Sequence, residues 1–526
     1  MKGQLCLIVA LCCITAYAQN PNAGGQGQGR QRNRQAQTPP PTEPGTAAAE
    51  GFSPTEGMHA APVSKDWVTT THTWHGHGQS VNYTATCGFI PIKDDSDVTE
   101  AQMFFVAYTK DGADRLTRPV TFAFNGGPGS SSVWLHMGAL GPRRAKMNED
   151  GTMPPPPFQI ADNEESWLPS TDIVMIDAVG TGYSRPTKPE LGAKFYGLQG
   201  DLAAFTAFIK GYISEEGRWR SPILVAGESY GGIRVAGLSN SLLQAGVAVN
   251  GIISISGVMN FGTIDPAKDN DIPYLSYLPA ECATAMYFHK IPDANFKGTI
   301  AACEEFASGE YAAALMKGNG LSDVAKKHIA AKLASFTGLS PLYIERSNLR
   351  ISPFGFRAEL LRDNWDIIGR YDGRIVGHNS NGVSQGAEYD PSDAATSPVF
   401  TAAFNDYITH ELNFHTSETY RITAYRQING WNYGTDGQTP DTSEMLRRAM
   451  EQNPYMKVLL CCGWYDLACP YFGMRYVMDH LGEQKKLEKN IKFQYFPAGH
   501  MLYIDTVSRQ KFGRDIAEFI TSATGR

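Results

Sequence analysis

Six short apolar runs, separated by stretches with helical spacing, constrain the fold of this chain most. The runs are Val120–Phe124, Asp172–Ile176, Ile223–Ala226, Ile252–Ile255, Val458–Cys462 and Ile491–Phe496. In Tyr196–Ile213, Leu202, Phe205 and Ile209 recur at the spacing of one helix face. Apolar strands that alternate with helices are typical of a parallel sheet covered on both faces. We therefore predict an α/β fold with a mostly parallel central sheet flanked by helices.

One long interior region interrupts this alternation. Between 266 and 399, aromatic, proline- and glycine-bearing loops accompany three helix-like pieces, Cys282–Phe288, Leu321–Leu333 and Ala358–Asp366. We interpret 266–399 as a largely helical cap insertion that shapes a pocket over the sheet. The core of the fold is then predicted to consist of 58–265 and 400–526.

The first 57 residues are predicted to lie outside the fold. A basic second residue, the apolar run Leu5–Ile14 and small residues before position 19 follow the plan of a secretory signal peptide, placed at 1–18. That run is too short to cross a hydrocarbon core about 30 Å thick, and no later stretch predicts a membrane span. Residues 19–57 have almost no large apolar side chains, which predicts a disordered low-complexity leader. We expect an exported protein, periplasmic or extracellular in a bacterium, and lysosomal, vacuolar or secreted in a eukaryote.

Charge and metal-ligand patterns exclude several partners. The formal net charge is −7, so the sequence lacks the excess of positive charge that is typical of nucleic-acid-binding proteins. No Cys or His cluster has zinc spacing, so we expect neither a metal nor an organic cofactor. We interpret His72, His75 and His77 as part of a polar turn between two strands. Cys282 and Cys303 are candidates for a local disulfide in an oxidising compartment, and nothing in the sequence indicates an oligomeric state.

A serine in a glycine-rich turn is the clearest sign of chemistry. Residues 227–231, Gly-Glu-Ser-Tyr-Gly, fit the pattern G-x-S-x-G. They follow the apolar run Ile223–Ala226 and precede the helical stretch Ile233–Leu243. Small residues allow a sharp turn from strand to helix that presents the serine hydroxyl at the helix N-terminus. We predict that Ser229 is a nucleophile.

A nucleophilic serine needs a base, and the base needs an orienting acid. Asp466 follows the run Val458–Cys462, and His500 follows the run Ile491–Phe496. Both loops leave the carboxyl ends of predicted strands, the edge at which such sheets carry their sites. The chain order serine, acid, histidine is that of α/β-hydrolases. We therefore predict a triad of Ser229, Asp466 and His500.

A second glycine-rich turn supplies candidate donors for an oxyanion. Residues 125–131, Asn-Gly-Gly-Pro-Gly-Ser-Ser, follow the strand Val120–Phe124, and glycines let backbone N–H groups approach a ligand closely. In α/β-hydrolases one oxyanion donor comes from such a turn and the other from the residue after the nucleophile. A phosphate-binding loop is the alternative, but the turn lacks the G-K-[ST] ending and Pro128 has no N–H.

Five motifs are spread in one order from about residue 120 to about residue 505: FNGGPGSSS, DAVGTGYS, GESYGG, GWYDLACP and AGHM. Together they resemble the serine carboxypeptidase family of α/β-hydrolases. The resemblance implies that Ser229 is the nucleophile, Asp466 the orienting acid and His500 the base. It also implies an oxyanion hole formed by the N–H groups of Gly127 and Tyr230, and removal of single residues from the C-terminus of a peptide.

The resemblance further implies a pocket for the free carboxylate of the substrate. Asn125 matches the asparagine of the family that donates a hydrogen bond to this carboxylate, beside the N–H of Gly126. Glu228 matches the acid that shares a proton with it. The family's partner of that glutamate corresponds here to Ala139, so a second carboxyl group is absent.

Arg143 and Arg144 lie just beyond this position. We hypothesise that they supply charge to the pocket instead, and ordinary surface arginines are the alternative. We thus predict an exported serine carboxypeptidase that forms an acyl-enzyme with peptides carrying a free C-terminus. If Ala139 means that the carboxylate site is lost, an esterase or acyltransferase on the same fold is the first alternative. A catalytically inactive binding protein is the second.

Overall fold

The computed structural model describes residues 67–428, 430–433, 439–482 and 485–525. The predicted signal peptide and leader lie outside the described residues. Among the described helices, none has the length and apolar character of a membrane span.

A ten-stranded sheet forms the centre of the fold. Its first strands, β1 (Val68–Gly76), β2 (Gln79–Lys93) and β3 (Thr99–Lys110), are antiparallel to one another, and β3 is antiparallel to β7 (Asp172–Ile176). From β7 the order is β7-β4-β9-β10-β13-β14, all parallel. The other parallel strands are β4 (Val120–Phe124), β9 (Ile223–Glu228), β10 (Gly251–Ile255), β13 (Lys457–Gly463) and β14 (Ile491–Phe496). All six apolar runs are therefore parallel strands, as predicted.

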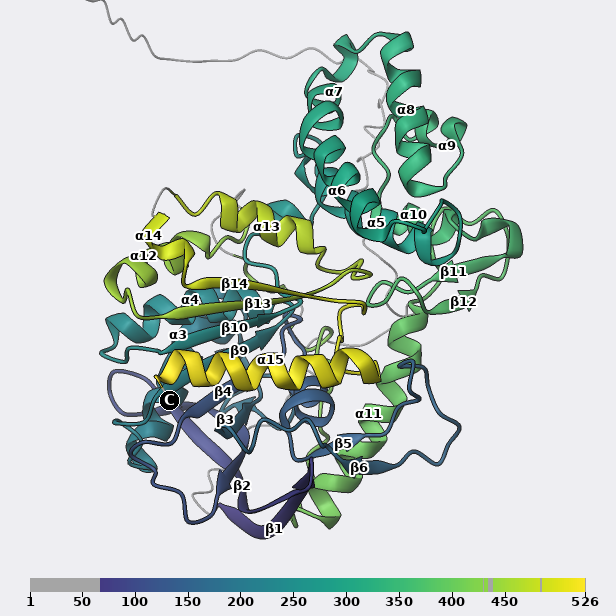
Figure 1. The fold of residues 1–526 in the computed structure, drawn as a ribbon. Coiled ribbons are helices and arrows are strands. Elements are labelled where there is room, and N and C mark those ends of the chain that lie inside the picture. The colour runs from purple at the N-terminus through teal and green to yellow at the C-terminus, as the bar shows by residue number, and fades with distance from the viewer. Residues whose placement is uncertain (1–66, 429, 434–438, 483–484, 526) are drawn as a thin grey trace, which may run out of the picture. The chain divides into compact units, whose positions relative to one another are not determined.

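Helices cover both faces of this sheet (Figure 1). Alternate strand residues enter two separate apolar clusters, because successive side chains of a strand point to opposite faces. Phe122 and Val225 belong to one cluster, and their neighbours Ala123 and Leu224 belong to the other. The first cluster includes α3 (Leu198–Glu215), α4 (Gly231–Gln244), α12 (Ser443–Gln452) and α13 (Tyr471–Asp479). The second includes α11 (Pro391–His410) and α15 (Thr506–Thr524).

A third apolar cluster joins the region predicted as a cap to Cys462, Leu467 and Tyr471 of the predicted core. Its helices are α5 (Ile272–Tyr287), α6 (Phe296–Phe306), α7 (Ala312–Met316), α8 (Asp323–Thr337), α9 (Pro341–Arg346) and α10 (Pro353–Glu359). Two of the three predicted helical pieces fall in α5 and α8. The third, Ala358–Asp366, is only partly helical: α10 ends at Glu359, a 3₁₀ turn covers Arg362–Asn364, and Trp365 has a left-handed φ of +61°, which no helix continues through. Strand β11 (Asp366–Ile368) follows and pairs with β12 (Val376–His378).

The described part also contains several short elements. Among them are α1 (Val133–Leu135), a π-helical turn (His136–Leu140), β5 (Arg143–Ala145), β6 (Ile160–Asp162), β8 (Arg185–Pro186), α2 (Gly192–Phe195) and α14 (Lys485–Glu488). Strand β5 pairs with β6, and β8 pairs with β3.

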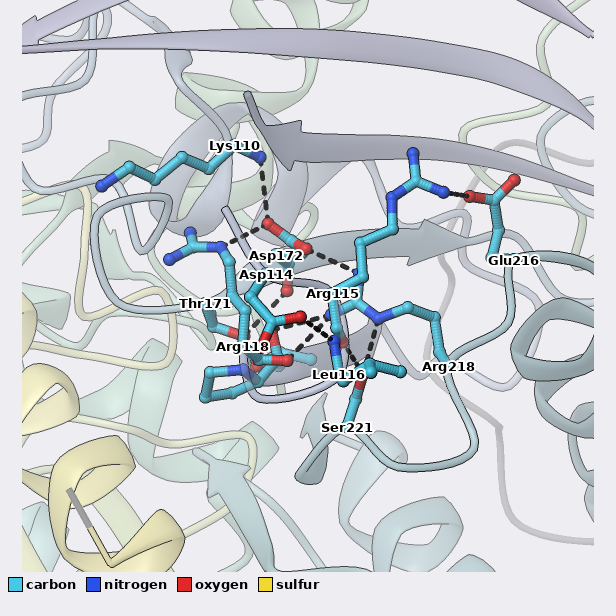
Figure 2. A network of polar contacts seen from close by, with 12 residues as sticks. Lys110, Asp114, Arg115, Leu116, Arg118, Thr171, Asp172, Glu216, Arg218 and Ser221 are labelled. Atoms are coloured by element: carbon cyan, nitrogen blue, oxygen red, sulfur yellow. Dashed lines mark hydrogen bonds and ion pairs between the residues drawn. The ribbon is translucent and has the colours of Figure 1, made fainter. Parts of the chain in front are cut away.

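A buried ionic network joins the amino ends of three parallel strands (Figure 2). Asp172, the first residue of β7, accepts from Arg118 Nε at 2.6 Å and from Arg218 Nη1 at 2.7 Å. Arg218 also donates to the Ser221 hydroxyl at 2.7 Å, just before β9. Because all three charged side chains are buried, each needs these partners. The network holds the end of the sheet opposite to the loops in which the predicted triad lies.

Candidate active site

Ser229 occupies the sharp turn between β9 and α4. Its φ is +63°, a left-handed conformation that costs a non-glycine residue free energy and needs support from its surroundings. The Ser229 N–H donates to the Ile255 carbonyl at 3.1 Å, and its own carbonyl accepts from the N–H groups of Gly232 and Val258 at 2.8 and 3.1 Å. A Cβ on Gly232 would lie 2.5 Å from the Val258 carbonyl oxygen, so a side chain does not fit there. The strand, turn and helix predicted around Ser229 are present, and its side chain is partly exposed.

Asp466 and His500 follow neighbouring strands, β13 and β14, so the sheet brings their loops together. The His500 Nδ1 lies 2.8 Å from Oδ2 of Asp466. The other carboxylate oxygen accepts from the N–H groups of Ala468 and Cys469 at 2.8 and 2.9 Å, which fixes its orientation. Burial lowers the pKa of His500, but the charge and hydrogen bond of Asp466, with the charge of Glu228, raise this pKa above its ordinary value overall.

The glycine-rich turn after β4 lies directly against the nucleophile turn. A Cβ on Gly126 would meet the backbone N of Tyr230 at 2.4 Å. Gly127 has a φ of +107°, which favours glycine. Within the described part of the chain, neither the N–H of Gly127 nor that of Tyr230 donates a backbone hydrogen bond. Two N–H donors are therefore available close to Ser229, the arrangement that an oxyanion requires.

Asn125 and Glu228 are two buried polar side chains beside these turns. Nδ2 of Asn125 donates to Oε1 of Glu228 at 2.8 Å, and Oδ1 of Asn125 accepts from the Leu135 N–H at 2.9 Å. Burial raises the pKa of Glu228 to about 7, against the opposing positive charge of His500. Near neutral pH this carboxyl group is therefore partly protonated and is able to donate a hydrogen bond.

Of the two arginines proposed for the carboxylate pocket, Arg143 already has carboxylate partners elsewhere. Arg143 pairs with Asp162 at 2.5 Å and with Glu411 at 3.0 Å. Burial, with the charge of Arg509, lowers the pKa of Arg144 to about 10. The structure thus contradicts the hypothesis for Arg143, whose charge is already matched by two carboxylates, and it places Arg144 beside another cation.

A loop in the predicted cap, which the sequence did not indicate, joins the two loops that carry Asp466 and His500. We call 369–375 the bridging loop. The Arg370 carbonyl accepts from the Leu467 N–H at 3.1 Å, and the Tyr371 carbonyl accepts from the His500 N–H at 2.5 Å. The Tyr371 ring also stacks on the imidazole of His500, with centroids 5.3 Å apart.

An ion pair between the half-buried Arg374 and the buried Asp372 links the bridging loop to the loop of His500. Arg374 pairs with Asp372 through two contacts, Nε to Oδ1 at 3.0 Å and Nη2 to Oδ2 at 2.7 Å. Arg374 also donates to the Pro497 carbonyl at 2.8 Å, and Asp372 accepts from the Gly499 N–H at 3.1 Å. Opposite charges two residues apart form no recognisable motif, so only the tertiary structure shows this pair.

The three histidines noted in the sequence do not form a metal site. His72 and His75 lie in strand β1, and only His77 lies in the turn that follows, where it approaches Glu165 at 3.2 Å. The predicted turn is therefore wrong for the first two, because the alternating pattern continues the strand to Gly76. Across the described ranges, no group of three or more metal-binding side chains is present.

The predicted disulfide is not formed in the structure. The described cysteines are all free and buried: Cys87, Cys282, Cys303, Cys461, Cys462 and Cys469. Cys282 on α5 and Cys303 on α6 have their thiols in contact. Burial raises the pKa of the Cys303 thiol well above its ordinary value. The reactive thiolate is therefore disfavoured in the folded chain.

The sheet, its two helical layers and the serine turn at its carboxyl edge define an α/β-hydrolase fold. A family model described as serine carboxypeptidase matches residues 76–502. The chain belongs to the serine carboxypeptidase family.

The chain is similar in sequence to a yeast carboxypeptidase and in fold to the crystal structure of a yeast carboxypeptidase. Over 213 residues, the chain is 30% identical to the pheromone-processing carboxypeptidase KEX1 of Saccharomyces cerevisiae. That alignment spans 36% of this chain and 27% of the yeast protein, so it covers about a quarter of the relative. The crystal structure of Kex1(delta)p, a prohormone-processing carboxypeptidase from Saccharomyces cerevisiae, has a TM-score of 0.53 at 20% identity. That match covers 83% of this chain and 91% of the yeast chain, and it concerns the fold.

Proposed function

We propose that this protein is a serine carboxypeptidase that releases C-terminal residues from peptides through Ser229, Asp466 and His500. The observation that carries this proposal is the buried contact of 2.8 Å between His500 and Asp466, on loops at the same sheet edge as the Ser229 turn. Family membership supplies the reaction class.

The chemistry follows from this arrangement. His500 takes the hydroxyl proton of Ser229 as its oxygen attacks the carbonyl carbon of the last peptide bond. The N–H groups of Gly127 and Tyr230 hold the oxyanion. His500 then returns the proton to the departing amine, and water hydrolyses the acyl-enzyme by the same route. Asp466 holds the imidazole in the required orientation throughout.

Recognition of a free C-terminus is assigned to the neighbouring polar groups. Asn125 and the Gly126 N–H donate to the terminal carboxylate, and Glu228 shares a proton with it. A carboxylate held here places the last peptide bond, and no other, beside Ser229. The same proposal includes export directed by 1–18, a leader at 19–57 and a cap at 266–399 on a core of 58–265 and 400–526.

The test compares wild type with Ser229→Ala on a blocked dipeptide whose C-terminus is either free or amidated, from pH 4 to 8. We expect cleavage of the free form only, and its complete loss in the variant. Ala139 is the observation that favours the second candidate, an esterase or acyltransferase. Consumption of a blocked ester by wild type, with neither peptide cleaved, would establish that candidate and refute the carboxypeptidase.

A further inference from the structure

Two buried polar atoms in the candidate carboxylate pocket have no hydrogen-bond partner among the described residues. They are Oε2 of Glu228 and the hydroxyl of Tyr503. The two side chains are 3% and 1% exposed, and they interact with each other and with Asn125 without reaching hydrogen-bond geometry at these two atoms. Unsatisfied buried polar groups are costly and rare in folded proteins. Two such atoms side by side can donate to and accept from a polar group of a ligand.

The backbone at Gly138 leaves the space that the ring of Tyr503 occupies. A Cβ on Gly138 would lie only 2.3 Å from Cε2 of Tyr503, so the ring packs directly on this glycine. Gly138 and Ala139 belong to the π-helical turn His136–Leu140, and such turns are frequent at functional sites. The segment in which the family carries its second acid thus presents a glycine and an alanine here, and an aromatic ring lies against it.

We propose that Tyr503 is a third member of the carboxylate pocket and that its hydroxyl donates a hydrogen bond to the C-terminal carboxylate of the peptide. Tyr503 then replaces, with a neutral donor, the second carboxyl group that Ala139 removes. This inference rests on the proposed function, because it assumes a substrate with a free C-terminus.

The two donors differ in how they respond to pH. Glu228 donates only while it is protonated. Burial holds the pKa of Tyr503 well above its ordinary value, so the phenol keeps its proton throughout the neutral range. The pocket therefore retains one side-chain donor that does not titrate, besides the amide of Asn125.

The test uses Tyr503→Phe, which removes one oxygen and keeps the ring against Gly138. Tyr196→Phe is the matched control, because the Tyr196 hydroxyl is also buried without a hydrogen-bond partner in the described part and is not among the proposed site residues. Loss of a hydrogen bond to a charged group is expected to raise KM for the free-carboxyl peptide by about 10- to 100-fold. The kcat on that peptide and both constants on its methyl ester should stay within about twofold of wild type. Tyr196→Phe should match wild type on both substrates.

A binding measurement separates recognition from catalysis. In the Ser229→Ala background, calorimetry should show that Tyr503→Phe weakens binding of the free-carboxyl peptide by the same factor and leaves the amidated peptide unaffected. An unchanged affinity for the free form, or an equal loss for both forms, overturns the role of Tyr503 and leaves the proposed function standing. If wild type shows no Ser229-dependent cleavage of the free peptide, the proposed function fails and this inference fails with it.

Discussion

At the scale of the residue, the protonation states of His500 and Glu228 determine the pH range in which the proposed mechanism works. His500 must be neutral to act as a base, and its pKa lies above the ordinary value. Glu228 must be protonated to donate to a carboxylate, and its pKa is about 7. His500 gains a proton as the pH falls, and Glu228 loses its proton as the pH rises. A neutral His500 and a protonated Glu228 therefore occur together only around neutral pH.

The first prediction concerns the alkaline side of this range. For a free-carboxyl peptide, wild-type KM should rise about tenfold per pH unit once the pH exceeds the pKa of Glu228. Glu228→Gln carries a permanently neutral amide that donates at every pH, so its KM should stay flat from pH 6 to 9. Steady-state kinetics on the free peptide and on its methyl ester checks this.

The methyl ester is the internal control, because it has no carboxylate for Glu228 to bind. Its KM should be independent of pH in both proteins, while its kcat falls on the acidic side as His500 gains a proton. A parallel alkaline rise of KM for the ester would assign the effect to another group.

Sequence reasoning placed some residues of the site and missed others for a physical reason. Ser229, Asp466 and His500 each follow a strand run, so strand ends alone bring them to one edge. Tyr503, which we propose for the carboxylate pocket, packs its ring directly on Gly138, where a side chain would not fit. That fit depends on packing between segments far apart in the chain, and no local pattern encodes it.

At the scale of the element, the bridging loop determines how the loops of Asp466 and His500 are held. Its backbone accepts from both loops, and the Asp372–Arg374 pair fastens it to Pro497 and Gly499. A shift of about 1 Å in a catalytic group costs up to about 100-fold in rate. The second prediction is that Arg374→Met lowers kcat by about 10- to 100-fold and changes KM by less than threefold.

The matched control is Arg447→Met, which removes a surface arginine paired with Glu444 and Glu451 on α12. Its kcat should equal that of wild type. Arg374→Lys, which restores one charge, should recover part of the loss. Equal falls of kcat in the Arg374 and Arg447 variants would refute a positioning role for Arg374.

The strands of the sheet can be predicted from the sequence more readily than the elements of 266–399, because their signal is local. The six apolar runs are buried on both faces of the sheet, so their composition alone identifies them. In Ala358–Asp366, helical spacing persists, but the left-handed turn at Trp365 and the pairing of β11 with β12 override it. These are tertiary effects, which local propensity does not report.

The third prediction concerns the network at the amino ends of the strands. Asp172→Asn leaves the buried cations Arg118 and Arg218 without their shared carboxylate. Breaking a buried ionic network in this way is expected to lower the free energy of unfolding by about 3–5 kcal/mol. Urea denaturation followed by fluorescence checks the value. Glu444→Gln, which breaks an exposed ion pair, should leave the urea midpoint unchanged.

At the scale of the whole molecule, a buried acid in the predicted cap links the free energy of unfolding to pH. Glu281 on α5 is 2% exposed, and its Oε1 has no hydrogen-bond partner in the described ranges. Its surroundings include Cys303, Tyr311 and Tyr343, whose own pKa values its charge would raise. Burial raises the pKa of Glu281 from 4.5 to about 8. The folded chain therefore holds this proton through a range in which the unfolded chain releases it.

The sign of the fourth prediction follows from proton linkage. Between pH 4.5 and 8 the folded state binds more protons than the unfolded state, so the free energy of unfolding falls as the pH rises. The full difference is worth at most about 5 kcal/mol, at 1.36 kcal/mol for each pH unit. Glu281→Gln has no proton to lose. Its stability relative to wild type should therefore increase steadily from pH 4.5 to 8 and then level off.

The difference in the free energy of unfolding between Glu281→Gln and wild type reports on Glu281 alone, because Glu228 and every other titrating residue contribute equally to both proteins. Urea midpoints at pH 4.5, 6 and 8 give the difference directly. Glu305→Gln, an exposed glutamate on α6, should follow wild type at each pH. A difference between Glu281→Gln and wild type that stays constant over the three pH values would show that Glu281 is ionised in the fold, with a partner that stabilises its charge. The expected divergence would mean instead that Glu281 destabilises the fold least in acid, where this carboxyl group is neutral in both states.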